Sequence, residues 1–116
     1  MATLIIRGKE VEIDNDCVSL IIYFNNNGLD TKYCCDGKNN NGTFYIMFED
    51  YIEDSQMEEF LSKYRSKYDH SPFLGKFVKW CRVVNGKIKY NWMYLAMPEH
   101  AKYDYELLME EVFNDK

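Results

Sequence analysis

The clearest pattern in the chain is a pair of runs rich in β-branched and aromatic residues, at 77–84 and 87–97. Only Asn85-Gly86 separates the two runs. A two-residue Asn-Gly loop is the strongest short signal for a β-hairpin, because both central residues must accept a positive φ. The pattern therefore predicts a long hairpin in which every residue of one run lies opposite a fixed residue of the other.

The predicted register pairs Val84 with Lys87 and Trp80 with Asn91, and alternation sorts the side chains onto two faces. The first face is mainly apolar, and we expect it to face the core: Phe77, Lys79, Cys81, Val83, Ile88, Tyr90, Trp92 and Tyr94. The second face carries cations around a tryptophan, and we expect it to be a working surface: Val78, Trp80, Arg82, Val84, Lys87, Lys89, Asn91 and Met93.

The N-terminal residues 3–13 predict a second, tight hairpin. Placing Gly8-Lys9 at the turn sets Arg7 opposite Glu10, so that a charged pair lies beside the turn.

Residues 14–27 fit either a helix or a strand. A helix is favoured by the spacing of four apolar residues, Cys17, Leu20, Ile21 and Phe24, and by Gly28 at its end. A strand is favoured by the β-branched and aromatic content of 18–24, with Asn26-Asn27-Gly28 as a turn. We favour the helix.

Further along, 31–35 and 43–49 predict two strands joined by the loop 36–42, which is rich in Gly and Asn. Ser55 and Glu58 fit a capping box at the start of a helix. A last helix is expected to begin at Pro98. Together these elements predict an α+β fold, in which antiparallel β-hairpins form a sheet packed with about three α-helices. We expect residues 1–116 to form a single domain.

Composition narrows the class of protein. The content of ten Tyr, seven Phe and two Trp argues against disorder. The sequence shows no apolar run near the ~20 residues that cross a bilayer and no secretory signal at its start. We therefore expect a cytoplasmic protein without a membrane partner.

Charge is unevenly distributed in this acidic chain, whose formal net charge is −5. The stretch 70–98 holds five cations and no acid, which leaves nine of the 14 cations with all 19 acids. The acidic majority argues against direct nucleic-acid binding. A basic hairpin fits one local anionic ligand, although its cations can also simply solvate the sheet and pair with neighbouring acids.

The side chains that carry chemistry form no recognisable catalytic or metal motif. Cys34 and Cys35 are adjacent, with no Cys-x-x-Cys spacing and no nearby His, so we expect free thiols and no metal. Neither thiol has an evident base to make it a nucleophile. His70 and His100 belong to no triad. We therefore expect a non-enzymatic protein with no catalytic residue and no cofactor.

A ligand site is expected on the basic hairpin face. Trp80 offers a stacking surface for a base, although packing under a helix is the somewhat favoured alternative. Arg82 offers a fork for phosphate and Asn91 a paired donor and acceptor for a base edge. Lys89 and Arg65 are expected to add positive charge.

The loop after Cys35 is a second place for an anion. Backbone amides from Gly37 to Gly42 can form a phosphate nest, to which Lys38 adds charge.

Residues 25–37 read Asn-Asn-Asn-Gly-Leu-Asp-Thr-Lys-Tyr-Cys-Cys-Asp-Gly. This segment resembles small proteins of phages and prophages of Gram-positive bacteria, which carry Thr-x-aromatic-Ser/Cys-Cys-x-Gly before a loop and a strand such as 45–48. Usual members place His after the Gly, where this chain has Lys38, so the role of that His does not carry over. The resemblance implies a counter-defence role. One class of such proteins, the anti-Thoeris and anti-CBASS sponges, captures cyclic nucleotide signals, and we extend the resemblance to that class.

Three functional hypotheses follow. The first is an oligomeric sponge that sequesters a phosphate-bearing cyclic nucleotide signal in the host cytosol. The second is an acidic, anti-CRISPR-like inhibitor that binds a host defence nuclease. The third is an enzyme that acts through Cys34 or Cys35.

Overall fold

The structure is a computed structural model that describes residues 2–37, 42–68 and 73–114. Its elements follow in the order β1 Ala2–Ile6, β2 Lys9–Ile13, a 3-10 turn Asn15–Cys17, α1 Val18–Asn26, β3 Thr31–Cys35, β4 Phe44–Phe48, α2 Asp54–Tyr68, β5 Lys76–Val84, β6 Lys87–Ala96 and α3 Pro98–Asn114. The predicted α+β class is confirmed: β1 and β2 form one antiparallel sheet, and β3-β4-β6-β5 form another.

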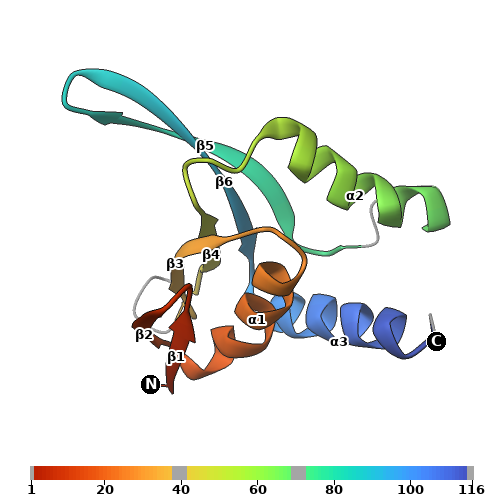
Figure 1. Ribbon diagram of the computed structural model, residues 1–116. Helices are drawn as coiled ribbons and strands as arrows, with labels where there is room; N and C mark the ends of the chain where they lie inside the picture. The colour runs from red at the N-terminus through yellow and green to blue at the C-terminus, as the bar shows by residue number, and fades with distance from the viewer. Residues whose placement is uncertain (1, 38–41, 69–72, 115–116) are drawn as a thin grey trace.

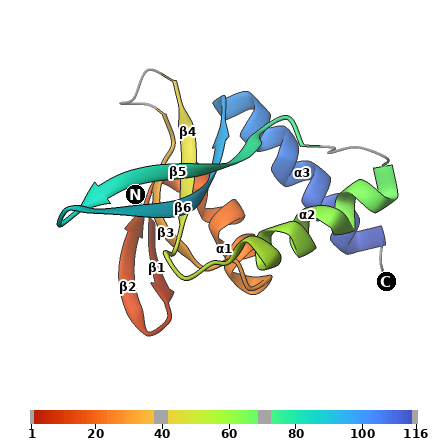
Figure 2. The same cartoon turned by 90° about the horizontal axis from the view of Figure 1, so that it is seen from above.

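The three helices lie on one side of the four-stranded sheet (Figures 1 and 2). Phe24 of α1 is the centre of the core between them, with its ring 5.2 Å from Phe48, 5.9 Å from Tyr94 and 6.0 Å from Phe60. These edge and tilted contacts between aromatic rings add to the free energy of burying them. Aromatic rings from both the sheet and the helices therefore fill the layer between them.

The β5–β6 hairpin extends well past the rest of the sheet (Figures 1 and 2). β4 pairs with β6 from Ala96 to Met93, and its ladder then stops. β5 and β6 remain paired with each other as far as Val84 and Lys87. We call residues 79–92, which lie beyond the last β4–β6 pair, the hairpin arm.

The predicted register of this hairpin is confirmed along its whole length, including Trp80 opposite Asn91 and Val84 opposite Lys87. Asn85 has a φ of 53° and Gly86 a φ of 77°, as a type I′ turn requires.

The expected division into a core face and a solvent face is wrong for the arm. On the expected core face, Tyr94 is buried and Phe77 and Trp92 are partly buried where the hairpin joins the body. Farther out on the same face, Val83 and Ile88 are exposed. On the expected outer face, Asn91 and Met93 are buried. The reason is that the arm extends beyond both β4 and the helices. The burial of a side chain therefore depends on its distance from the body as well as on the face of the hairpin that carries it.

The N-terminal hairpin also differs from the prediction. Its turn is Arg7-Gly8, with φ values of 50° and 79°, and Ile5 instead of Arg7 pairs with Glu10. Arg7 can hold a positive φ because its guanidinium group donates to Asn25 and to the carbonyl oxygen of Thr31.

The predicted helix within residues 14–27 is confirmed. Residues 18–26 are helical, and the four spaced apolar residues of this segment are buried: Cys17, Leu20, Ile21 and Phe24. The capping box at Ser55 is wrong by position, because α2 begins at Asp54. The Gln56 side chain accepts the backbone N–H of Glu53 at 2.9 Å, which is the reciprocal half of a capping box.

Candidate functional site

The hairpin arm carries a continuous apolar patch on one face. Cys81 pairs with Tyr90 and Val83 pairs with Ile88, so the four side chains are cross-strand and same-face neighbours. Val83 is 71% exposed, Ile88 61% and Tyr90 55%, and Cys81 is also exposed. We call these four residues the arm patch.

The opposite face of the arm carries Trp80, which is 49% exposed. Arg82 lies on the same face and is paired across the ladder with the exposed Lys89. The structure thus brings together three residues of the predicted ligand site on one side of the hairpin. Trp80 is open to solvent and does not pack beneath a helix.

The fourth residue of that site, Asn91, is engaged within the protein. Its amide donates to the carbonyl oxygen of Phe48 at 3.0 Å and to Asp50 at 2.6 Å, and its oxygen accepts from Arg82 Nε at 3.0 Å. An Asn amide with these partners is already satisfied on both ends. Asn91 therefore anchors the arm to the end of β4 instead of facing a ligand.

Asp50 is the acceptor at the centre of this polar cluster. Arg82 and Lys32 each place a nitrogen 3.0 Å from its Oδ1. Hydrogen bonds from Asn91 and Lys32, together with the nearby charges of Lys32 and Arg82, lower the pKa of Asp50 to about 2. Arg82, which was predicted to bind a phosphate, is therefore already engaged with an internal carboxylate that it shares with Lys32.

A second acid fastens the other side of the arm base. Asp54, at the start of α2, accepts from Lys79 Nζ at 2.8 Å and from Trp92 Nε1 at 2.9 Å. These two donors lower the pKa of Asp54. Lys79 also lies 5.6 Å from the ring centroid of Tyr90, within the range of a cation–π contact. The base of the arm is held from both faces, while its tip projects.

Two predicted site residues are not placed by the structure. Lys38 and the side chain of Arg65 lie outside the described residues. Sequence reasoning missed two residues: Asp50, which follows β4, and Asp54, the first residue of α2. Their acidic character was visible, but their partners are remote in sequence.

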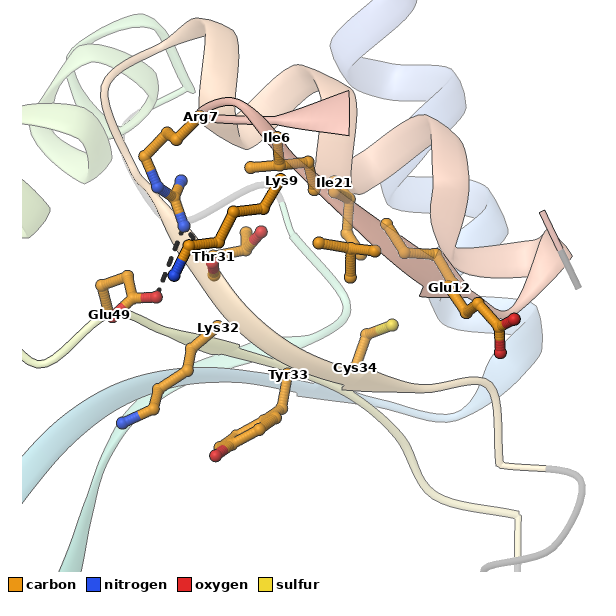
Figure 3. A pocket seen from close by; sticks show the side chains of 12 residues that line it. Ile6, Arg7, Lys9, Glu12, Ile21, Thr31, Lys32, Tyr33, Cys34 and Glu49 are labelled. Atoms are coloured by element: carbon orange, nitrogen blue, oxygen red, sulfur yellow. Dashed lines mark hydrogen bonds and ion pairs between the residues drawn. The ribbon is translucent and has the colours of Figure 1, made fainter. Parts of the chain in front are cut away.

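A groove of about 350 Å³ separates the N-terminal hairpin from the edge of β3, and Figure 3 shows it from close by. Arg7 lies in its wall and donates to the Thr31 carbonyl oxygen at 2.9 Å and to Glu49 at 3.4 Å. Lys9 and Tyr33 also line the groove. The Arg7 side chain donates to Glu49 and to Asn25. We therefore interpret this groove as part of the contact that attaches the N-terminal hairpin to the body, and not as a ligand site.

A protein-family model described as YoqC prophage protein matches residues 5–114. The chain belongs to this family. The match spans the arm, the groove and all three helices, and it confirms the predicted relation to prophage proteins at that level. No curated protein and no solved structure matches the chain significantly. Within the described residues, no helix has the length and apolar character needed to cross a bilayer.

Proposed function

We propose that this prophage protein is a non-enzymatic counter-defence protein that docks on a host defence protein through its hairpin arm. The observation that carries the proposal is the arm patch, in which three large apolar side chains are more than half exposed on a projecting ribbon. Contiguous exposed apolar surface of this kind is typical of interaction sites in soluble proteins.

The energetics of the arm favour binding. Fully burying a Val, Ile or aromatic side chain contributes about 1.5–3 kcal/mol. The ladder and the type I′ turn already order Val83, Ile88 and Tyr90, so little backbone entropy is lost on association. A preformed ribbon with apolar side chains at its tip therefore suits insertion into a groove of a partner.

The charge of the arm indicates the kind of surface to which it would bind. Residues 73–97 contain no acid, and Lys87 and Lys89 are exposed at the same tip, on the face opposite the arm patch. Lys79 forms an ion pair with Asp54, and Arg82 shares Asp50 with Lys32, so Lys87 and Lys89 are the cations at the tip itself. The complementary surface is an apolar groove with an acidic rim.

The prophage family supports a counter-defence role as the biological setting. In a prophage protein, a surface that binds other proteins fits a host partner that would otherwise block infection. The acidic inhibitor of our second sequence hypothesis would bind through negative charge outside the arm. Salt-sensitive binding that survives substitutions in the arm would favour that hypothesis.

The experiment compares the wild type with Val83→Thr/Ile88→Thr, which removes apolar surface but keeps β-branched residues in the ladder. Ile5→Thr/Ile22→Thr is the matched control, because Ile5 and Ile22 are exposed apolar residues away from the arm. Each version is expressed in bacteria that carry single defence systems, and phage plaquing is measured. The purified protein of any system that is overcome is then titrated by calorimetry.

We expect the wild type and the control to restore plaquing against the same system, and the arm variant to lose at least tenfold in both plaquing and affinity. Equal activity of the arm variant overturns the proposal. Light scattering provides a further test: a wild-type dimer that the arm variant dissociates would make the arm patch an interface between copies and would also overturn it.

A second candidate is the capture of a cyclic nucleotide signal, which the exposure of Trp80 beside Lys89 favours. The protein is incubated with cyclic nucleotides, separated from free ligand and heated to release what it retained. Retention that Trp80→Ala abolishes and Val83→Thr/Ile88→Thr preserves supports this candidate over protein docking. Absence of retained nucleotide and of a thermal shift rejects it.

A further inference from the structure

The end of β3 and the segment after β2 bring together a mixed set of thiol and carboxylate groups. The Cys35 thiol and one carboxylate oxygen each from Asp14 and Asp36 lie within 4.8 Å of one another, and all three residues are partly buried. The backbone N–H of Asp36 also donates to Asp14 Oδ2 at 3.1 Å. We propose that Asp14, Cys35 and Asp36 form a binding site for a divalent metal ion, with Zn²⁺ as the ion that suits it best.

The donor set identifies the metal. Zn²⁺ binds thiolate at about 2.3 Å and carboxylate oxygen at about 2.0–2.2 Å, in tetrahedral geometry. Ligand atoms around such an ion lie about 3–4 Å apart, so small side-chain rotations bring the three groups to bonding distance. Ca²⁺ and Mg²⁺ require six or more oxygen ligands, which a thiol does not supply.

The local backbone explains why the three groups converge. Gly37 follows Asp36 with a φ of 88°, and its carbonyl oxygen accepts from the Gly42 backbone N–H at 3.0 Å. A Cβ at Gly37 would come within 3.0 Å of the backbone of Gly42 and Thr43, so glycine is needed for this closure. The closed loop holds Asp36 near the end of β3, facing Asp14.

Two further thiols lie behind the site. Cys34 pairs with the buried Ile46, whereas Cys35 pairs with Tyr45, so the two adjacent thiols point to opposite faces of β3. Cys34 is hydrogen-bonded to Cys17 and packs against the core. These thiols are therefore structural neighbours and not ligands, and the described residues supply three ligands to the four-coordinate geometry of Zn²⁺.

This inference is independent of the arm, because Cys35 lies on the opposite edge strand of the sheet from β5. It also departs from the sequence expectation that the cysteines bind no metal. That expectation rested on ligand spacing, and Asp14 is too far from Cys35 in the chain for spacing to reveal it.

The test is a titration of the chelator-treated, reduced protein with Co²⁺, whose thiolate complex absorbs by charge transfer in the near ultraviolet. We expect one Co²⁺ per chain, displacement by Zn²⁺ and a rise in melting temperature with Zn²⁺. Cys35→Ser is expected to abolish the charge-transfer band. Asp14→Asn and Asp36→Asn are each expected to weaken metal binding at least tenfold.

Cys81→Ser is the matched control, because Cys81 is exposed on the arm, and it should retain the full band. Circular dichroism establishes that each variant is folded, and Asp14→Asn keeps the test decisive should Cys35→Ser fail to fold. Absence of a charge-transfer band in the wild type overturns the proposal. So does a band that Cys34→Ser removes and Cys35→Ser leaves intact.

Discussion

Asn91 reaches from β6 to Asp50, with its Nδ2 2.6 Å from Asp50 Oδ1, and so joins the base of the arm to the chain that leaves β4. Asn91 is 2% exposed, and the same amide nitrogen donates to the Phe48 carbonyl oxygen. We predict that Asn91→Ala lowers the free energy of unfolding by about 2 kcal/mol, because it leaves buried polar groups without partners. Urea denaturation measures the change, and Lys89→Ala on the exposed tip should alter stability by less than about 0.5 kcal/mol.

Stability should fall at acid pH partly through Asp50. Its pKa in the folded protein is about 2, below the ordinary value of 3.8, so the carboxylate favours the folded state above pH ~4. That contribution is lost as the pH falls from about 4 to about 2. Because the side chain is 37% exposed, water screens the interaction and the contribution is below about 1 kcal/mol. Denaturant midpoints from pH 5 to pH 2 should fall less steeply for Asp50→Asn than for the wild type, and parallel curves would contradict the assignment.

Asp104 on α3 is a buried acid that accepts three hydrogen bonds. It is fully buried and accepts from the backbone N–H groups of Leu74 and Gly75 at 2.8 Å and from the Tyr94 hydroxyl at 2.6 Å. Burial and the Asp104 carboxylate raise the pKa of Tyr94, so the hydroxyl stays protonated and donates. We predict a loss of about 3 kcal/mol or more for Asp104→Ala and of about 1–2 kcal/mol for Tyr94→Phe. Equal losses would show that the backbone contacts contribute little.

Gly75 is required for close approach to the Tyr94 ring. A Cβ at position 75 would lie 2.5 Å from Cε2 of Tyr94, and Asp104 prevents the ring from moving away. We predict that Gly75→Ala lowers the free energy of unfolding by about 1–3 kcal/mol through overpacking. The same change made in a Tyr94→Ala background should cost much less, and a double-mutant cycle measures this coupling.

Asp54 is predicted to order the indole of Trp92 at the base of the arm. Removing its carboxylate in Asp54→Ala deletes the acceptor of both Lys79 and Trp92 Nε1. We expect the emission of Trp92 to become more quenchable by iodide, measured in a Trp80→Phe background so that Trp92 is the single tryptophan. Unchanged quenching would show that packing alone holds the ring. The control is Glu99→Ala, at the start of α3 and away from the indole.

Local signals in the sequence determined the elements and much of their pairing. Asn85-Gly86 predicted the hairpin and its register, because a turn with two positive φ values leaves one way to pair the flanking strands. The spacing of Cys17, Leu20 and Phe24 predicted α1, because helical periodicity places such residues on one buried face.

Tertiary structure alone decided which of these surfaces are free. Alternation assigns Val83 and Tyr94 to the same face of the hairpin, yet one is exposed and the other buried, because β4 and the helices cover the base of the ribbon and leave its tip. Likewise, Asp50 meets Arg82 and Asp14 meets Cys35 through chain reversals that bring remote residues together. A sequence pattern reports which side chains share a face, but burial and site formation depend on what packs against that face.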